Sequence, residues 1–226
     1  MARPRQGKGF AQVTPDLGEH MGHDVLLASL ASGEARVRGT AFSGLQLDGV
    51  SAVGAAFENV AFRGCAFDGV DFSSCTFTDV QFLSCRFISC AMARSWLNRV
   101  DFRSCSAPGM SFGKGRLTGV LIADSQFDYC DLSEASVSHL RAGATSLSEL
   151  NLFLTKLSHV ELGDCDLTRA TVYRSSLSGI DLSTCDISGI RVSGDFRDLR
   201  GVVVSAPQAV QLAGLLGVTV KEEEWL

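Results

Sequence analysis

Apolar residues recur at every fifth position of this chain from Val37 to Val192, without a polar residue among them and without a slip in the period. A second set of small residues lies two positions earlier in each five and runs from Ala35 to Ile190. Two inward positions spaced two apart fit an extended backbone, because alternate side chains of a strand share a face. The other three positions of each five are mostly Ser, Gly, Thr, Asp or Arg.

This period excludes the common regular structures. In an α-helix, residues five apart point ~140° away from one another, so no apolar stripe would form. In a flat strand an odd period alternates between the two faces. A chain that turns a corner every five residues satisfies both sets of positions, and a fixed short period of this kind is typical of solenoids.

The repeats resemble those of the pentapeptide-repeat family, whose pattern is Ala, then Asp or Asn, then Leu, then two variable residues. The matching stretches are Cys130-Asp131-Leu132-Ser133-Glu134, Cys165-Asp166-Leu167-Thr168-Arg169, Val70-Asp71-Phe72-Ser73-Ser74, Val100-Asp101-Phe102-Arg103-Ser104 and Ile180-Asp181-Leu182-Ser183-Thr184. The resemblance implies an all-β fold, a right-handed quadrilateral β-helix with four repeats per coil. With 20 residues per coil, the tract is expected to make about eight coils.

The ends of the chain lack the period, which predicts three segments. Residues 1–24 are expected to form a tail with a helical turn over Pro15–Met21. Residues 25–204 are the expected β-helix, opening with a degenerate coil near Val25. Residues 205–226 are predicted to form a helix, a short strand at Val218 and Val220 and an acidic tail. Pro207 suits the first turn of that helix and Gly217 its end.

The C-terminal helix is apolar over more than one face, which predicts an interface. The segment from Leu199 to Val218 resembles the C-terminal end of the Qnr and MfpA type of pentapeptide-repeat protein, where it caps the solenoid and pairs two subunits end to end. We therefore expect a homodimer, and a cap without pairing is the alternative. The expected interface residues are Val210, Leu212, Leu215, Leu216 and Val218.

All eight cysteines fall on the second, small-residue set of positions. Cys65, Cys85 and Cys105 are 20 apart and are expected to stack in one interior column. Parallel side chains in register do not supply the torsion of ~90° that a disulfide needs, and a linear ladder does not offer four converging zinc ligands. We predict small buried hydrophobic residues with reduced thiols, which favours a cytoplasmic location, and no metal or cofactor.

Composition and motifs argue against catalysis and against a membrane. The 226-residue chain has a formal net charge of −5, and it shows no nucleotide-binding loop and no nucleophile paired with a base. His139 and His159 lie at outward positions without an activating partner. The apolar window Val202–Val220 is interrupted by Pro207 and two glutamines, and no secretory signal is visible. We therefore predict a non-enzymatic protein that does not enter a membrane.

Outward charges and aromatics give the candidate contact residues. One side of the predicted coil collects Asp128, Glu149, Asp166 and Asp186, a tentative partner-binding face. Trp96, Leu121 and Phe153 are also predicted to point outward, and Trp96 is either a contact residue or an ordinary exposed aromatic.

The sequence supports two hypotheses about function. The preferred hypothesis is a protein-binding or structural scaffold. The alternative, implied by the Qnr and MfpA resemblance, is a DNA-mimicking modulator of DNA gyrase or topoisomerase IV, and possible fluoroquinolone resistance follows from it. The partner in either case is a protein, with no direct nucleic-acid binding. The uninterrupted repeats lack the loops of Qnr proteins, so the loop-free MfpA-like form is the closer comparison.

Overall fold

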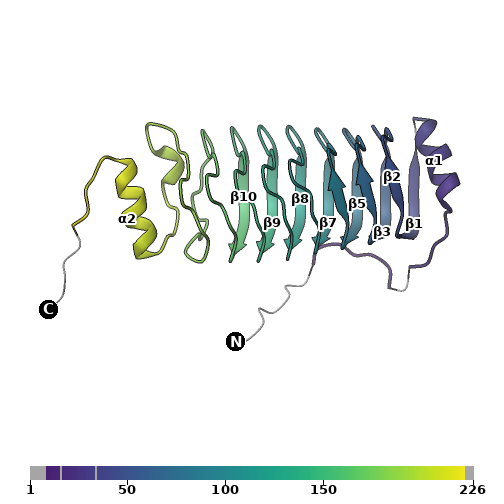
Figure 1. The fold of residues 1–226 in the computed structure, drawn as a ribbon, viewed down its shortest axis with the longest axis horizontal. Helices are drawn as coiled ribbons and strands as arrows, with labels where there is room; N and C mark the ends of the chain where they lie inside the picture. The colour runs from purple at the N-terminus through teal and green to yellow at the C-terminus, as the bar shows by residue number, and fades with distance from the viewer. Residues whose placement is uncertain (1–8, 16, 34, 222–226) are drawn as a thin grey trace.

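In the computed structural model the chain is a rod of stacked coils with a helix at each end (Figure 1). The structure describes residues 9–15, 17–33 and 35–221. The elements are α1 (His23–Ala31), β1 (Arg36–Ser43), β2 (Gln46–Asp48), β3 (Ala56–Arg63), β4 (Ala66–Asp68), β5 (Thr76–Leu83), β6 (Arg86–Ile88), β7 (Trp96–Arg103), β8 (Arg116–Ala123), β9 (Ser136–Gly143), β10 (Lys156–Gly163), the 3₁₀ turn η1 (Arg197–Leu199) and α2 (Ala206–Leu215). The all-β solenoid with a short C-terminal helix is confirmed.

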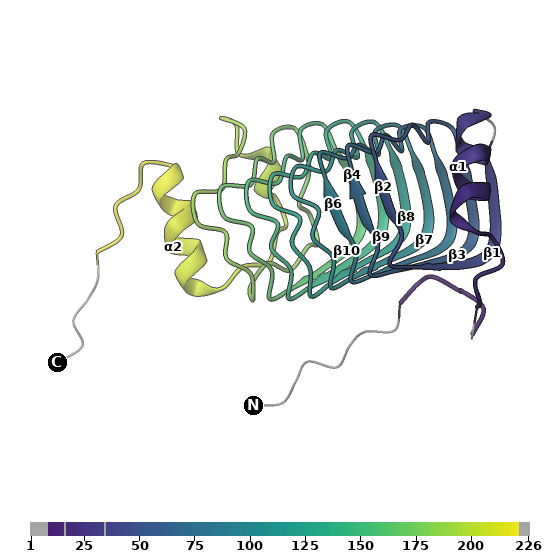
Figure 2. The same ribbon diagram turned by 45° about the vertical axis from the view of Figure 1, so that its right-hand side comes forward.

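Each residue of the solenoid pairs with the residue 20 positions further along the chain. Seven parallel strands form the longest sheet, in the order β1-β3-β5-β7-β8-β9-β10. Phe57 lies between Val37 and Phe77 in this register. A second, three-stranded sheet, β2-β4-β6, lies on another side of the rod (Figure 2). Further strips are joined by isolated bridges such as Ser51↔Asp71 and Thr171↔Arg191.

The long sheet ends one coil before the repeats do. Eight coils were expected from the length of the tract, and seven have a strand on this sheet. The last coil has a tight turn around Gly179 instead, and it pairs with the preceding coil through the bridges Asp166↔Asp186 and Thr171↔Arg191. The coil is therefore present, but its side chains are not carried on a regular strand.

Corners arise from one left-handed residue in almost every five. Asn59, Asp79 and His139, in the middle of β3, β5 and β9, have φ angles of 54°, 53° and 54°. Non-glycine residues adopt this region infrequently, and Asn and Asp tolerate it best because their short polar side chains bond locally. The fifth position of the repeat, two residues after the central apolar residue, is thus the place where the backbone bends.

Phenylalanine fills the N-terminal half of the core. Phe62 stacks on Phe82 with ring centroids 5.1 Å apart and planes 6° apart, and Phe82 stacks on Phe102 at 4.9 Å and 8°. Neighbours within a coil meet edge-on, as Phe62 and Phe67 do at 5.5 Å and 81°. Offset stacks and edge contacts are the favourable aromatic geometries, so the spacing of the coils and the shape of the rings agree.

Leucine fills the C-terminal half less completely. A cavity of about 50 Å³ lies there. Its lining is entirely apolar and includes Leu132, Leu147, Leu157 and Leu167. Leucine side chains branch before they reach the axis of the coil, whereas the flat phenyl rings of the other half stack across it. The two halves of the rod therefore have different packing.

The eight cysteines are free and buried, as predicted from their positions. Cys75 is fully buried and its Sγ lies 2.9 Å from the carbonyl oxygen of Ala52. Burial raises the pKa of Cys75 to about 12 and also raises the pKa of Cys130. These thiols act as small core side chains with weak hydrogen bonds.

The N-terminal end differs from the sequence prediction. The described part of Pro15–Met21 contains no helix, and the expected coil near Val25 is the helix α1. Leu26 and Leu30 of α1 are buried in the core and close the first coil. The solenoid thus begins at Arg36 rather than at residue 25, because a helix presents two leucines four apart to the open end. Residues 1–8 and Asp16 of the predicted tail lie outside the described residues.

At the C-terminal end the helix is confirmed and the strand is not. Ser205 precedes α2 as its N-cap, and Pro207 lies in the first turn. Gln208 is buried, and its amide donates to the carbonyl oxygens of Leu182 (2.8 Å) and Cys185 (2.7 Å). Residues 218–220 are irregular, since no neighbouring strand pairs with them. The predicted acidic tail, residues 222–226, lies outside the described residues.

Candidate functional site

The described residues contain no group of three or more His, Cys, Asp or Glu side chains that could hold a metal ion. His139 and His159 stack on adjacent strands with centroids 4.5 Å apart and planes 5° apart. Parallel rings direct their nitrogens alongside one another rather than toward a shared point, so this pair does not form a chelating site. No helix in the described ranges has the length and apolar character needed to cross a membrane.

The predicted acidic residues lie on one side of the rod, but each is engaged locally. Asp166 Oδ1 accepts the main-chain N–H of Thr168 at 2.8 Å, and Asp186 Oδ1 accepts that of Ser188 at 2.9 Å. These are turn-stabilising contacts of the kind Asp commonly makes two residues ahead. Hydrogen bonds from the side chain and the backbone of Ser188 lower the pKa of Asp186. Both carboxylates therefore carry charge and shape a turn at the same time.

The other two acidic residues are more fully occupied. Asp128 accepts hydrogen bonds from the hydroxyl of Ser146 and, at 2.8 Å, from the hydroxyl of Ser148. Glu149 forms ion pairs with Arg169 at 2.6 Å and with Arg191 at 3.4 Å. Two cations beside one carboxylate compensate its charge. Among the four predicted residues, Asp128, Asp166 and Asp186 have no cation partner among the ion pairs of the described residues.

Of the three residues predicted to point outward, two are exposed and one is buried. Trp96 is 47% exposed at the start of β7, between Thr76 and Arg116 in the sheet register. Phe153 is also exposed, beside Leu154. Leu121 is in register with the outward residues Asp101 and Arg141, but its side chain is only 4% exposed. Its strip of the sheet carries another piece of the chain.

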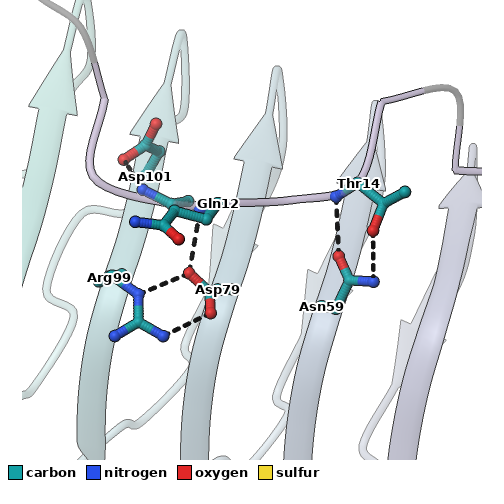
Figure 3. A network of polar contacts seen from close by, with 7 residues as sticks. Gln12, Thr14, Asn59, Asp79, Arg99 and Asp101 are labelled. Carbon is teal, nitrogen blue, oxygen red and sulfur yellow. Dashed lines mark hydrogen bonds and ion pairs between the residues drawn. The ribbon is translucent and has the colours of Figure 1, made fainter.

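That piece is an extended strap, residues 9–15, which crosses the outside of β7, β5 and β3 (Figure 3). The amides of Phe10 and Ala11 donate to Asp101 Oδ1 at 2.9 and 3.1 Å. The amide of Gln12 donates to Asp79 Oδ1 at 2.9 Å. Hydrogen bonds from main-chain groups of the strap to side chains of three successive coils hold it in place.

Thr14 forms the last step of this series. Its amide donates to Asn59 Oδ1 at 2.9 Å, and Asn59 Nδ2 donates back to the Thr14 hydroxyl at 2.8 Å. The chain then continues to the first coil, where Gly18 accepts the amide of Ala41 at 2.8 Å. Strap positions 10, 12 and 14 thus meet side chains at 101, 79 and 59, which is two strap residues per coil.

An arginine supports the middle of the strap. Arg99 Nε donates to Asp79 Oδ1 at 2.7 Å, and Arg99 Nη2 lies 2.5 Å from Asp79 Oδ2. Burial by itself would raise the pKa of Asp79, but the hydrogen bonds from Arg99 and Gln12 outweigh it and hold that pKa below its usual value. The carboxylate is therefore fixed in its charged form, ready to accept a main-chain N–H.

Apolar contacts lie at both ends of the strap. Leu17 is buried against Ala41 and Ala61, with Val13 packed beside them. At the other end the guanidinium of Arg141 lies 4.9 Å from the centroid of the Phe10 ring. A cation over an aromatic face contributes ~0.5–1 kcal/mol at an exposed site.

The free-energy contributions that favour and oppose ordering of the strap are of similar size. Ordering the backbone of five residues costs ~5–10 kcal/mol, at ~1–2 kcal/mol per residue. Three hydrogen bonds to carboxylates, at ~1.5–3 kcal/mol each, and two to an amide side chain, at ~0.5–1.5 kcal/mol each, return ~5–12 kcal/mol. The balance is close to zero, so the strap is bound but readily released.

Little in the amino-acid sequence indicates this arrangement. Asp79 and Asp101 occupy outward positions like many other aspartates of the repeats, and the strap has no period. The one available signal was Leu121, an apolar residue at a position where the neighbouring repeats are mostly polar.

Comparisons with known proteins bear on the repeats. The pattern described as pentapeptide repeat region matches residues 55–132, and that described as pentapeptide repeats (8 copies) matches residues 151–189. No curated protein sequence matches the chain.

Solved structures with a similar fold are more distant. HetL, a pentapeptide repeat protein involved in heterocyst differentiation regulation from the cyanobacterium Nostoc sp. strain PCC 7120, is 16% identical, with 81% of this chain and 95% of that chain covered and a TM-score of 0.34. Full-length QnrB1, a plasmid-mediated fluoroquinolone resistance protein, is 17% identical, with 82% and 100% covered and a TM-score of 0.38. Together the two family patterns cover most of the stacked coils, and the chain belongs to the pentapeptide-repeat family.

Proposed function

We propose that this protein is a non-enzymatic protein-binding scaffold that works as a homodimer joined at its C-terminal ends. The observation that carries the proposal is the apolar surface of α2 and the residues that follow it. Val210, Leu215 and Leu216 are 48%, 43% and 59% exposed, and Val218 is exposed beside them. Apolar side chains grouped at one end of a rod are typical of an association surface.

This surface is held in a fixed position. Gln208 anchors the first turn of α2 to the last coil through two carbonyl groups, and Leu212 packs partly against the core. The inner side of the helix is therefore satisfied by the solenoid, while its outer side remains available. Leu212 has mainly a structural role in this arrangement, and the other four predicted residues form the proposed interface.

Light scattering coupled to size exclusion tests the dimer. The chain has a mass of 24.1 kDa, so the proposed dimer has twice that mass. Leu215→Glu combined with Leu216→Glu is expected to give the monomer, because burying two carboxylates at an apolar interface is strongly unfavourable. Val25→Glu, at an equally exposed position on α1, is the matched control and should leave the dimer intact.

The proposal of a homodimer is wrong if the unmodified protein has the monomer mass at all concentrations. It is also wrong if the two α2 substitutions leave a dimer unchanged, because the contact would then lie elsewhere on the rod.

A second candidate function is modulation of DNA gyrase or topoisomerase IV by DNA mimicry. The observation that favours it is the pair Asp166 and Asp186, adjacent in one strip of the rod and without a compensating cation among the ion pairs of the described residues. Purified protein would then alter gyrase supercoiling at micromolar concentration. Asp166→Asn with Asp186→Asn keeps the turn contacts, removes the charge and should weaken the effect. No effect of the unmodified protein on supercoiling would leave the scaffold alone.

We also propose a cytoplasmic location. Eight buried free thiols are compatible with a reducing compartment, where cysteines remain unpaired. Fractionation of the native host, with detection of the chain in the cytosolic fraction, tests this placement.

A further inference from the structure

The outer face of the long sheet already binds an extended peptide, namely the strap. Its recognition is directed mainly at the main chain, because the amides of Phe10, Ala11 and Gln12 are the groups that Asp101 and Asp79 accept. Any extended segment offers such amides. Among the described contacts, the side-chain features selected are an aromatic ring near Arg141, an apolar side chain beside Ala41 and Ala61, and a hydroxyl beside Asn59.

We infer that this face, defined by Asn59, Asp79, Asp101 and Arg141, is a docking site for an extended segment of a partner protein. The strap is its built-in occupant and must leave before the partner binds. This inference rests on the proposed protein-binding function and names a surface and a partner chemistry for it. The partner segment is extended, has free main-chain N–H groups at alternate positions and carries an aromatic residue where the strap has Phe10.

The geometry of the strap supports its exchange for another chain. Among the described residues, every hydrogen bond of residues 10–14 is made with a side chain, and none completes the ladder of the sheet. The coils therefore remain paired with one another through β3, β5 and β7 when the strap is absent. Removal of the strap exposes a row of acceptors without opening the solenoid.

The acceptors are arranged before any ligand arrives. Asp79 is fixed by two contacts from Arg99. Asn59 and Asp79 occupy equivalent positions on β3 and β5, and Asp101 lies two residues further along on β7, in register with Gln81. A partner segment that follows the same path meets one acceptor for every two of its residues. Preorganised acceptors reduce the entropic cost of binding a flexible segment.

Substitutions in the full-length chain test the exchange. Gln12→Pro removes the N–H that Asp79 accepts and is expected to release the strap. Val13→Pro is the matched control, because the Val13 amide donates no hydrogen bond in the described structure, and the proline ring keeps apolar carbons beside Leu17, Ala41 and Ala61. Circular dichroism checks that both variants keep the fold.

The probe is a synthetic peptide of residues 9–15, Gly-Phe-Ala-Gln-Val-Thr-Pro, titrated into ¹⁵N-labelled protein up to millimolar concentration. The Gln12→Pro protein is expected to bind it at least tenfold more tightly than the unmodified protein, with shifts at Asn59, Asp79 and Asp101. The Val13→Pro protein should behave like the unmodified one. Equal binding by all three proteins, or binding by none, overturns the inference.

Amide hydrogen exchange of the unmodified protein gives a second measurement that needs no variant. The strap amide of Gln12 is expected to exchange at least a hundredfold faster than the amide of Val80 in β5. Equal exchange would show that the strap opens only with the whole fold, which also overturns the inference. Light scattering of the same samples reports the dimer separately, so failure at this face is distinguishable from failure of the proposed scaffold function.

Discussion

The cavity in the C-terminal half of the core leads to a prediction about packing. Leu147 lines the cavity and lies one coil after Phe127 in the same column. Replacing it by phenylalanine places a ring in the column in which Phe67 and Phe87 stack at 4.9 Å in the other half of the rod. Leu147→Phe is therefore expected to stabilise the protein.

The size of the gain follows from the cavity. A core cavity costs ~24 cal/mol per Å³, so the volume of about 50 Å³ corresponds to ~1.2 kcal/mol. A favourable aromatic pair adds ~0.5–1.5 kcal/mol, and the adjustment of neighbouring leucines removes part of both. We expect the free energy of unfolding to rise by about 1 kcal/mol, which for a chain of this length raises the melting temperature by ~2–4 °C.

Leu97→Phe is the matched control. Leu97 also follows a phenylalanine in its column, Phe77, but it is fully buried and does not line the cavity. A larger side chain there has no empty space to enter and should destabilise the protein by ~1–3 kcal/mol. Urea unfolding followed by circular dichroism measures both variants. If Leu147→Phe destabilises the protein as much as Leu97→Phe, the cavity does not govern the stability of this half.

Three further predictions concern ionisation and the C-terminal anchor. Cys75 ionises near pH 9.0 when unfolded but at about pH 12 in the fold, so this thiol alone should lower the free energy of unfolding by ~1.4 kcal/mol between pH 8 and pH 10. Urea unfolding of Cys75→Ser should therefore show a loss over this range that is smaller by that amount than the loss of the unmodified protein. The pKa of Asp79 is lowered in the fold, so the stabilisation that this carboxylate provides is complete above pH 3.8 and is lost as the pH falls further. The melting temperature of the unmodified protein should therefore fall more at acid pH than that of Asp79→Asn. Gln208→Ala leaves the carbonyls of Leu182 and Cys185 without their donor, and urea unfolding should show a loss of ~1–3 kcal/mol; an unchanged stability would show that water replaces the amide.

The fold was predictable because its determinant is local and repeated. A period of five with two inward positions leaves one geometric solution, and the 20-residue register of Phe57 on Phe77 follows from it. The pair Glu149 and Arg169 could also have been found, since the two positions are 20 apart. The partner-binding face of Asp128, Glu149, Asp166 and Asp186 stays a prediction, and the spacing of the repeats does not indicate the serine and threonine contacts of its aspartates.

The strap and α1 were not predictable by the same route. The contact of Phe10 with Asp101 joins residues 91 positions apart, and main-chain donors leave no trace in side-chain composition. Val25, Leu27 and Leu30 match the inward phases of the repeat. The helix instead buries Leu26 and Leu30 against the open end of the solenoid. Tertiary contacts, rather than local propensity, select these structures.

The strap also limits how this rod can change in length. Loss or gain of five residues within the repeats would rotate every later side by a quarter turn, whereas 20 residues would add or remove one full coil and keep all faces aligned. Between Ala41 and Arg141 even a full coil would separate the groups that the strap joins, from Gly18 to Phe10. Natural variants of different length are therefore expected to gain or lose coils between residue 141 and α2. The number of coils under the strap is expected to stay the same.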